Sequence, residues 1–367
     1  MKKKLISLIA IFLFLSIISA YANTGGVEGL ITVKGKVVEI VTHLKPDDLN
    51  AGEGSLIQEQ QIVKVRVMSG EFKGREYLVE NNMGSNEYYN IRVEEGDNIL
   101  LVLDTTTDQM QVYISGFARD TYEIIIILMF VLLLLAVGRM KGLKSVITLT
   151  ITLVVILKVI VPAIISGRNP IMVSVAGSIV ITVLTLTIVS GINRKSLSAI
   201  LGTLSGVFMA GGIAYVIGTL SKLTGLNSEE AVMLMYIPGD IDLNLKGILF
   251  AGILIGTLGA VMDVSMSIAS SMHEIKRIKS DISRKDLFKS GMNVGRDIMG
   301  TMSNTLILAY TGASIPILII FTAYNISFIE IVNLDVMATE IIRAVAGSIG
   351  IILSIPLTAA ITVFTEK

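Results

Sequence analysis

Seven apolar stretches follow one another after residue 121, and each approaches the length of a lipid-spanning helix. A transmembrane helix needs about 20 mostly apolar residues, and 52% of this chain is hydrophobic while 16% is charged. The sequence therefore predicts an α-helical polytopic membrane protein. The predicted spans are Tyr122–Val137, Ser145–Ile165, Ile171–Ser190, Ser196–Leu220, Gly247–Ser271, Asp297–Phe321 and Thr339–Phe364.

The first 22 residues have the pattern of an export signal. Lys2, Lys3 and Lys4 precede the short apolar run Leu5–Ile18, and small residues flank a cleavage position after Ala22. The alternative is an uncleaved signal anchor. Either form delivers the following segment across the membrane, so the topology downstream is the same.

Residues 23–119 differ from the rest because charges return and alternation replaces long apolar runs. Short strands with glycine turns predict a small exported β-barrel-like domain, OB-like in form. Tyr88-Tyr89 is either a ligand-binding pair or a packing element of a turn or core. The expected strands are 30–41, 61–68, 75–80, 90–93, 99–103 and 110–115, and residues 120–367 form the transmembrane helical domain.

The loops between the spans carry an uneven charge. Positive residues follow the first, third and fifth spans, and acidic residues dominate the intervening loops. By the positive-inside rule this predicts a plasma-membrane protein with an extracytoplasmic N-terminal domain and a cytoplasmic C-terminus. The positive clusters are Arg139, Lys141 and Lys144, then Arg194 and Lys195, and finally the basic residues of 276–289.

Asp263 lies well inside the fifth apolar span, where an ionisable group costs several kcal/mol unless it is paired, protonated, solvated or used. Ser267, Ser270 and Glu274 share its helical face with Gly252 and small residues between. We expect this face to look toward other helices or a water-filled path. The alternative is a purely structural hydrogen bond between helices.

Asp297, Thr301 and Asn304 share one face of the sixth span. Asn304 and Asp263 each lie nine residues from the cytoplasmic end of their helices, a depth of roughly 13 Å. We therefore predict that Asp263 faces the sixth span, within hydrogen-bond reach of Asn304, Ser303 or Thr301, directly or through one water. Lys158 in the second span either pairs with Asp263 or extends to the outer interface.

Two glycine pairs and one loop carry structural predictions. Gly202-x-x-x-Gly206 and Gly252-x-x-x-Gly256 are typical of close helix packing. Ser228 is placed to cap a short helix beginning at Glu229, which we expect to end before Pro238.

Several chemistries are excluded or not favoured. The chain has no cysteine, two histidines and no P-loop motif, so we expect no cofactor, no metal site and no enzymatic activity. Lys and Arg together number 30, as do Asp and Glu, which gives no argument for nucleic acid. An intramembrane aspartyl protease needs two adjacent carboxylates, and only Asp263 is deep.

Two long motifs resemble the YibE/F-like family of bacterial membrane proteins. They are Ile255–Glu274 (IGTLGAVMDVSMSIASSMHE) and Gly295–Tyr310 (GRDIMGTMSNTLILAY). The resemblance implies a multi-pass membrane protein for which permease-like roles are supposed, and it carries over no catalytic residues. The motif positions in this chain are Asp263, Ser267, Ser270, Glu274, Arg296, Asp297 and Asn304.

The sequence thus predicts a transporter or permease with a polar path through the fifth and sixth spans. With no P-loop, it is ion-coupled, passive or driven by a partner ATPase. The alternative is a non-transporting platform in the bilayer, whose exported domain binds a partner protein or a second copy. The candidate path residues are Asp263, Ser267, Ser270, Asp297, Thr301, Asn304 and Lys158.

Overall fold

The computed structural model describes residues 29–44, 57–106, 110–237 and 241–366. The predicted signal peptide lies outside these residues. The chain divides into two compact units, Met1–Val137 and Gly138–Lys367, which are described in turn.

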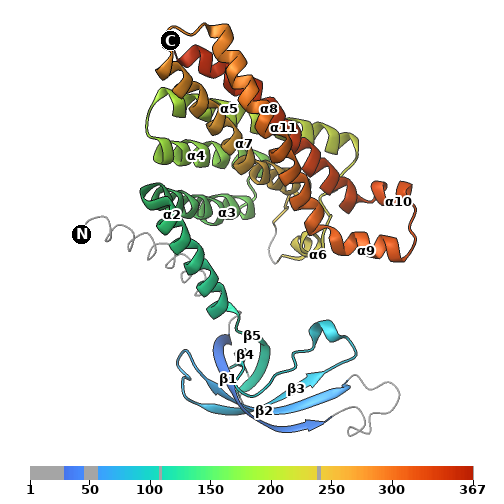
Figure 1. The fold of residues 1–367 in the computed structure, drawn as a ribbon. Coiled ribbons are helices and arrows are strands. Elements are labelled where there is room, and N and C mark those ends of the chain that lie inside the picture. Colours follow the sequence, from blue (N-terminus) through green and yellow to red (C-terminus); the bar gives the residue numbers. More distant parts are fainter. Residues whose placement is uncertain (1–28, 45–56, 107–109, 238–240, 367) are drawn as a thin grey trace, which may run out of the picture. The chain divides into compact units, whose positions relative to one another are not determined.

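The N-terminal unit contains a strongly curved five-stranded antiparallel sheet, followed by the helical residues from Asp120 (Figure 1). Inward side chains alternate with exposed ones along each strand, so one face encloses an apolar core that includes Val65, Ile99 and Leu101. The predicted barrel is therefore a half-barrel. Its strands, in the spatial order β3-β2-β1-β4-β5, are β1 (Leu30–Leu44), β2 (Glu59–Val67), β3 (Glu76–Met83), β4 (Asn98–Asp104) and β5 (Gln111–Phe117).

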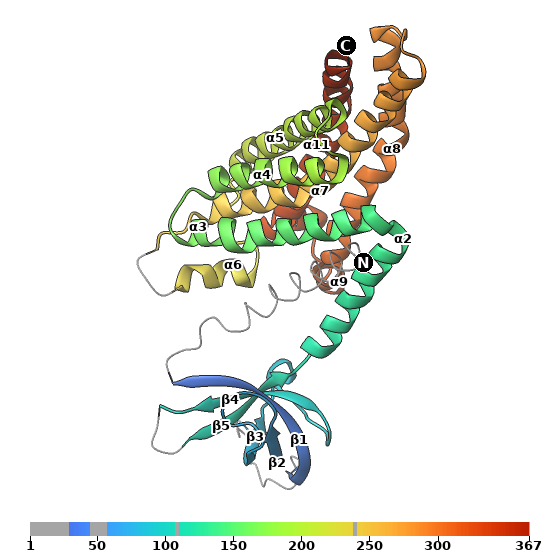
Figure 2. The same ribbon diagram turned by 90° about the vertical axis from the view of Figure 1, so that its left-hand side faces the viewer.

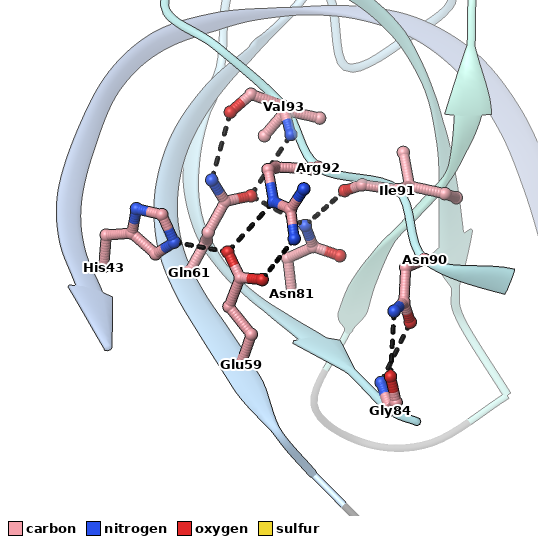
Figure 3. Close-up of polar contacts among 9 residues, drawn as sticks. All are labelled: His43, Glu59, Gln61, Asn81, Gly84, Asn90, Ile91, Arg92 and Val93. Atoms are coloured by element: carbon pink, nitrogen blue, oxygen red, sulfur yellow. Dashed lines mark hydrogen bonds and ion pairs between the residues drawn. The ribbon is translucent and has the colours of Figure 1, made fainter. Parts of the chain in front are cut away.

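The predicted strand at residues 90–93 is wrong: this segment has no regular structure. Figure 3 shows why it still lies against the sheet. The Gln61 amide binds both backbone groups of Val93, at 3.1 and 3.2 Å, and the Asn81 amide donates to the carbonyl of Ile91 at 2.7 Å. Two side-chain amides on β2 and β3 thus replace a backbone ladder.

The C-terminal part of the chain is helical, and its long apolar helices indicate a membrane protein. Among the residues that the structure describes, five helices are long and apolar enough to cross a bilayer, or six if the bent pair α8 and α9 is one span. The helices are α2 (Asp120–Val154), continued by a π-helical turn η2 (Val155–Ile160) and α3 (Val161–Ile165), then α4 (Pro170–Ser190), α5 (Arg194–Leu220), α6 (Glu229–Met233) with the 3₁₀ turn η3 (Leu234–Tyr236), α7 (Leu245–Ile278), α8 (Arg284–Ala313), α9 (Ile315–Ala323), α10 (Phe328–Asn333) and α11 (Asp335–Thr365).

Three predicted spans differ in form from the structure. The first two run from Asp120 to Ile165 with no loop between them. The helix is interrupted only at Arg139, whose backbone is left-handed (φ 49°, ψ −121°). The sixth is broken at Ser314, where α8 and α9 meet at 59°. Pro316 in the first turn of α9 supplies no backbone N–H, which favours a new helix start over continuation.

Helix α7 lies at the centre of the bundle and packs against α4, α5, α8 and α11 (Figure 2). The backbones of α5 and α11 approach closely, because a Cβ on Gly202 would lie 2.0 Å from Oγ1 of Thr358 and one on Gly206 would lie 2.7 Å from Cβ of Ser354. The packing prediction for Gly202-x-x-x-Gly206 is confirmed.

The predicted helix after Ser228 is also confirmed. The Ser228 hydroxyl accepts a hydrogen bond from the backbone N–H of Ala231 at 3.2 Å, which caps α6. Pro238 lies outside the described residues.

Candidate functional site

One face of α7 is not covered by neighbouring helices. Gly252, Gly256, Gly259, Asp263 and Ser267 are all exposed on it, and a Cβ added to Gly252 or Gly259 would meet no atom within 4 Å. The opposite face is fully buried in the bundle. The expected close packing at Gly252-x-x-x-Gly256 is therefore wrong at Gly252, which leaves open space, whereas Gly256 does lie close to a side chain of α8.

A groove of about 480 Å³ contains the Asp263 carboxylate; we call it the Asp263 groove. Asp263 makes no hydrogen bond or ion pair with any other residue that the structure describes. Ser267 and Ser270 supply the polar atoms of the groove, and α8 closes one side with apolar side chains. The lining residues are Asp263, Val264, Met266, Ser267, Ser270, Ile298 and Met302.

A second groove, of about 410 Å³, lies near the start of α7; we call it the Glu340 groove. Its charged lining residues are Glu230, Glu340 and Arg343. Since Arg343 is paired with Glu340 at 2.6 Å, Glu230 leaves the groove with a net negative charge. Hydrogen bonds from its own backbone N–H and from Ser228 lower the pKa of Glu230. The groove is lined by Gly225, Asn227, Ser228, Glu230, Ala231, Leu234, Leu245, Ile248, Leu249, Gly252, Glu340 and Arg343.

Tyr310 stands between the two grooves. A Cβ on Gly256 would lie 2.8 Å from the Tyr310 hydroxyl, so the phenol lies directly over the α7 backbone. The guanidinium of Arg343 is 5.6 Å from the centre of the Tyr310 ring, within the range of a cation–π contact. Gly252 and Asp263 are eleven residues apart, or roughly 16 Å along the helix, and Gly256 lies between them. The two grooves therefore lie on one helix face, with the contact of Tyr310 and Gly256 between them.

The polar face of α8 does not point toward Asp263. Asp297, Thr301 and Asn304 are exposed, whereas Ile298 and Met302 face the Asp263 groove. The predicted direct hydrogen bond from Asp263 to Asn304, Ser303 or Thr301 is not formed. The two helices are adjacent as expected, but α8 is rotated so that its apolar residues meet Asp263.

Lys158 lies in the π-helical turn η2, is exposed, and does not pair with Asp263. This turn packs on α4, where Ile160 fills the space over Gly177. Helix α4 in turn contacts α7, so Lys158 belongs to a helix layer one removed from the predicted path.

Comparison with known proteins shows the family to which this chain belongs. A family model described as YibE/F-like protein matches residues 126–367, and one described as YibE/F family N-terminal domain matches residues 31–117. The chain belongs to the YibE/F-like family. No curated protein and no solved structure matches it. The resemblance carried by Ile255–Glu274 and Gly295–Tyr310 is thereby confirmed.

One polar contact in this YibE/F-like chain had no signal in the sequence. The Nδ1 atom of His273, near the end of α7, lies 2.7 Å from a carboxylate oxygen of Glu366, just after α11. Glu366 is largely buried. Helical periodicity gives no information on which helix ends meet, so only the tertiary packing reveals this pair. Its neighbour Glu274 pairs with Arg277 instead.

The N-terminal half-barrel of this YibE/F-like protein holds an ion-pair cluster (Figure 3). Arg92 contacts Glu59 through two nitrogens, at 3.1 and 2.5 Å, and Nε2 of His43 lies 2.5 Å from the same carboxylate. The Arg92 guanidinium is the main cause that lowers the pKa of Glu59 to about 2. Among the described residues, no group of three or more His, Asp and Glu side chains gathers to hold a metal.

Proposed function

We propose that this YibE/F-like protein is a plasma-membrane permease that moves a small cation along the open face of α7. The observation that carries the proposal is the succession of the Glu340 groove, Tyr310 over Gly256, and the Asp263 groove on one helix face. A transport path needs polar atoms at both ends and a narrow point between them, and this face supplies all three.

The proposal includes a topology of seven spans. A helix of 46 residues, as from Asp120 to Ile165, is roughly 69 Å long, more than twice the 30 Å of a hydrocarbon core. We infer that the left-handed residue Arg139 turns the chain between two spans, and that α8 and α9 form one bent span. Positive loops after the first, third and fifth spans then lie in the cytoplasm.

In this topology the start of α7 is on the outer side and its end is on the cytoplasmic side. The Glu340 groove becomes the outer entrance and the Asp263 groove the inner one. Glu230 gives the outer groove a net negative charge, since Glu340 is paired with Arg343, and Asp263 is the unpaired carboxylate of the inner groove. Carboxylates without cationic partners attract cations, which supports a cationic substrate.

The test is a flux screen with purified protein in liposomes. Protons and small monovalent and divalent cations are supplied one at a time, with Asp263→Asn as the variant and Asp242→Asn, in the loop before α7, as the control. We expect one cation to pass in wild type and in the control, and its flux to fall in Asp263→Asn. Equal flux in wild type and Asp263→Asn for every cation that passes would reject the proposed path.

A second candidate function rests on the exported domain. Tyr88 and Tyr89 are 86% and 74% exposed and contact each other edge to face, with ring centres 5.0 Å apart. Exposed tyrosines are frequent anchors of protein interfaces, which supports a platform that binds a partner. Replacing both with serine distinguishes the two functions: a non-transporting platform loses its cellular role, whereas a permease keeps its cation flux in liposomes.

A further inference from the structure

The outward face of α8 carries polar side chains that nothing in the described chain covers. Thr301, Asn304, Thr305 and Thr311 are exposed on it, together with Asp297 at its cytoplasmic end and Leu308 between them. We call these six residues the polar α8 face. In the seven-span topology proposed above, most of this face lies at the depth of the hydrocarbon.

Asn304 has the side-chain amide of this face, and exposing that amide to lipid costs free energy. The hydroxyl of Thr301 donates to the carbonyl of Ile298 at 2.9 Å, and that of Thr305 donates to the carbonyl of Thr301 at 2.8 Å. Both threonines are thus satisfied within their own helix. The Asn304 amide has no hydrogen-bond partner among the residues that the structure describes, and an unpaired amide is costly in an apolar medium.

The first half of α2 cannot supply this partner. Its residues 124–137 are Ile, Leu, Met, Phe, Val and Ala only, so none of their side chains donates or accepts a hydrogen bond, whatever their position. The required occupant therefore presents a polar side chain at the depth of Asn304.

A second copy of the same helix meets this requirement. A primary amide has two N–H donors and a carbonyl acceptor, so two Asn304 side chains related by a two-fold axis satisfy each other. Gly300 lies one turn before Asn304, and a Cβ added there would meet no atom within 4 Å. A small residue one turn from a polar one allows two membrane helices to approach closely.

We propose that the polar α8 face is the interface of a homodimer, in which α8 packs against α8 of a second copy and the two Asn304 amides hydrogen-bond across the axis. The centre of this interface, Asn304, does not line the Asp263 groove, whose α8 wall is formed by Ile298 and Met302. The proposal shares the membrane topology with the permease but does not depend on transport.

Single cysteines test the interface, because the chain has none of its own. The test variants are Thr301→Cys, Asn304→Cys and Leu308→Cys. Native membranes that contain one variant each are oxidised, and the fraction of disulfide-linked dimer is measured. The controls are Met302→Cys, which faces α7, and Leu132→Cys on the apolar half of α2. We expect dimers at one or more of the first three positions and not at the controls. Dimers no more abundant at any of these three positions than at Leu132 would overturn the proposal.

A second measurement separates the hydrogen bond from mere proximity. Asn304→Leu keeps an α8 side chain of similar size and removes its polar atoms, whereas Thr301→Val removes a hydroxyl already satisfied within its helix. One interhelical hydrogen bond in a membrane changes dimerisation about 3- to 18-fold, and the two-fold axis makes two, so losing both weakens dimerisation about 8- to 300-fold. We expect this loss for Asn304→Leu, measured by dilution in lipid bilayers, and no change for Thr301→Val. Unchanged dimerisation of Asn304→Leu would refute the role of Asn304.

Discussion

The hydroxyl of Tyr310 on α8 lies over Gly256 on α7, 2.8 Å from the point that a Cβ on Gly256 would occupy. On one side of this contact, Gly252 lines the Glu340 groove, and on the other Asp263 lines the groove that bears its name. The missing side chain at position 256 therefore gives the Tyr310 hydroxyl room to lie against α7 between the two grooves.

Gly256→Val should reduce cation flux. Its methyl groups would occupy the space under Tyr310, and overpacking of this kind forces side chains and backbone to shift, which obstructs the face between the two grooves. The measurement is the initial rate of flux in liposomes. Gly212→Val is the matched control, since a Cβ at that exposed α5 position meets no atom within 4 Å. Equal rates for the two variants would contradict a narrow point at Gly256.

The proposed topology predicts the side of the membrane on which two loops lie. A reporter active only in the cytoplasm should give signal when fused within Lys276–Lys289 and none within Glu229–Tyr236. The reason is the basic character of the first segment and the acidic start of the second. Signal from the second segment alone would reverse the orientation of both grooves.

The ion-pair cluster of the half-barrel predicts a pH dependence. Because Arg92 lowers the pKa of Glu59 to about 2 from an ordinary value of 4.5, the ionised form is stabilised in the folded state. This stabilisation is complete above pH 4.5 and is lost as the pH falls toward 2. At pH 7, Glu59→Gln should lower the free energy of local opening by about 1–2 kcal/mol.

The measurement is amide hydrogen exchange of residues 91–93 in the full chain in detergent, comparing wild type and variant at each pH. Glu80→Gln is the control, because Glu80 is exposed and makes no ion pair with any residue that the structure describes. The difference between Glu59→Gln and wild type should shrink as the pH approaches 2. A difference that stays constant from pH 7 to pH 2 is inconsistent with an ionised Glu59 as its source.

The sequence predicted the parts of this molecule that depend on local chemistry. Long apolar runs predicted the helices, Ser228 predicted the cap of α6, and Gly202 and Gly206 predicted close packing of α5, although not that α11 is its partner. It also predicted which residues share a face, because helical spacing alone decides that. The family followed from two long motifs.

The sequence did not predict which face of a helix meets which neighbour. Asp297, Thr301 and Asn304 do share one face of α8, but rotation of that helix presents Ile298 and Met302 to Asp263. Rotation depends on packing against both α7 and α11, where Gly295 is pressed on Ile355. The irregular segment 90–93 was missed for a related reason: its partners are side-chain amides of Gln61 and Asn81, which alternation patterns do not register.

The most direct test of the account is water access along α7. Single cysteines replace Gly252 and Ser267 on the open face, with Ile253 and Ile268, buried on the same helix, as matched controls. A charged, membrane-impermeant thiol reagent is applied to each side of sealed vesicles. The account predicts labelling of Gly252→Cys from the outside, labelling of Ser267→Cys from the cytoplasmic side, and none at the two isoleucine positions. No labelling of Gly252→Cys or Ser267→Cys from either side would contradict a water-filled path on this face.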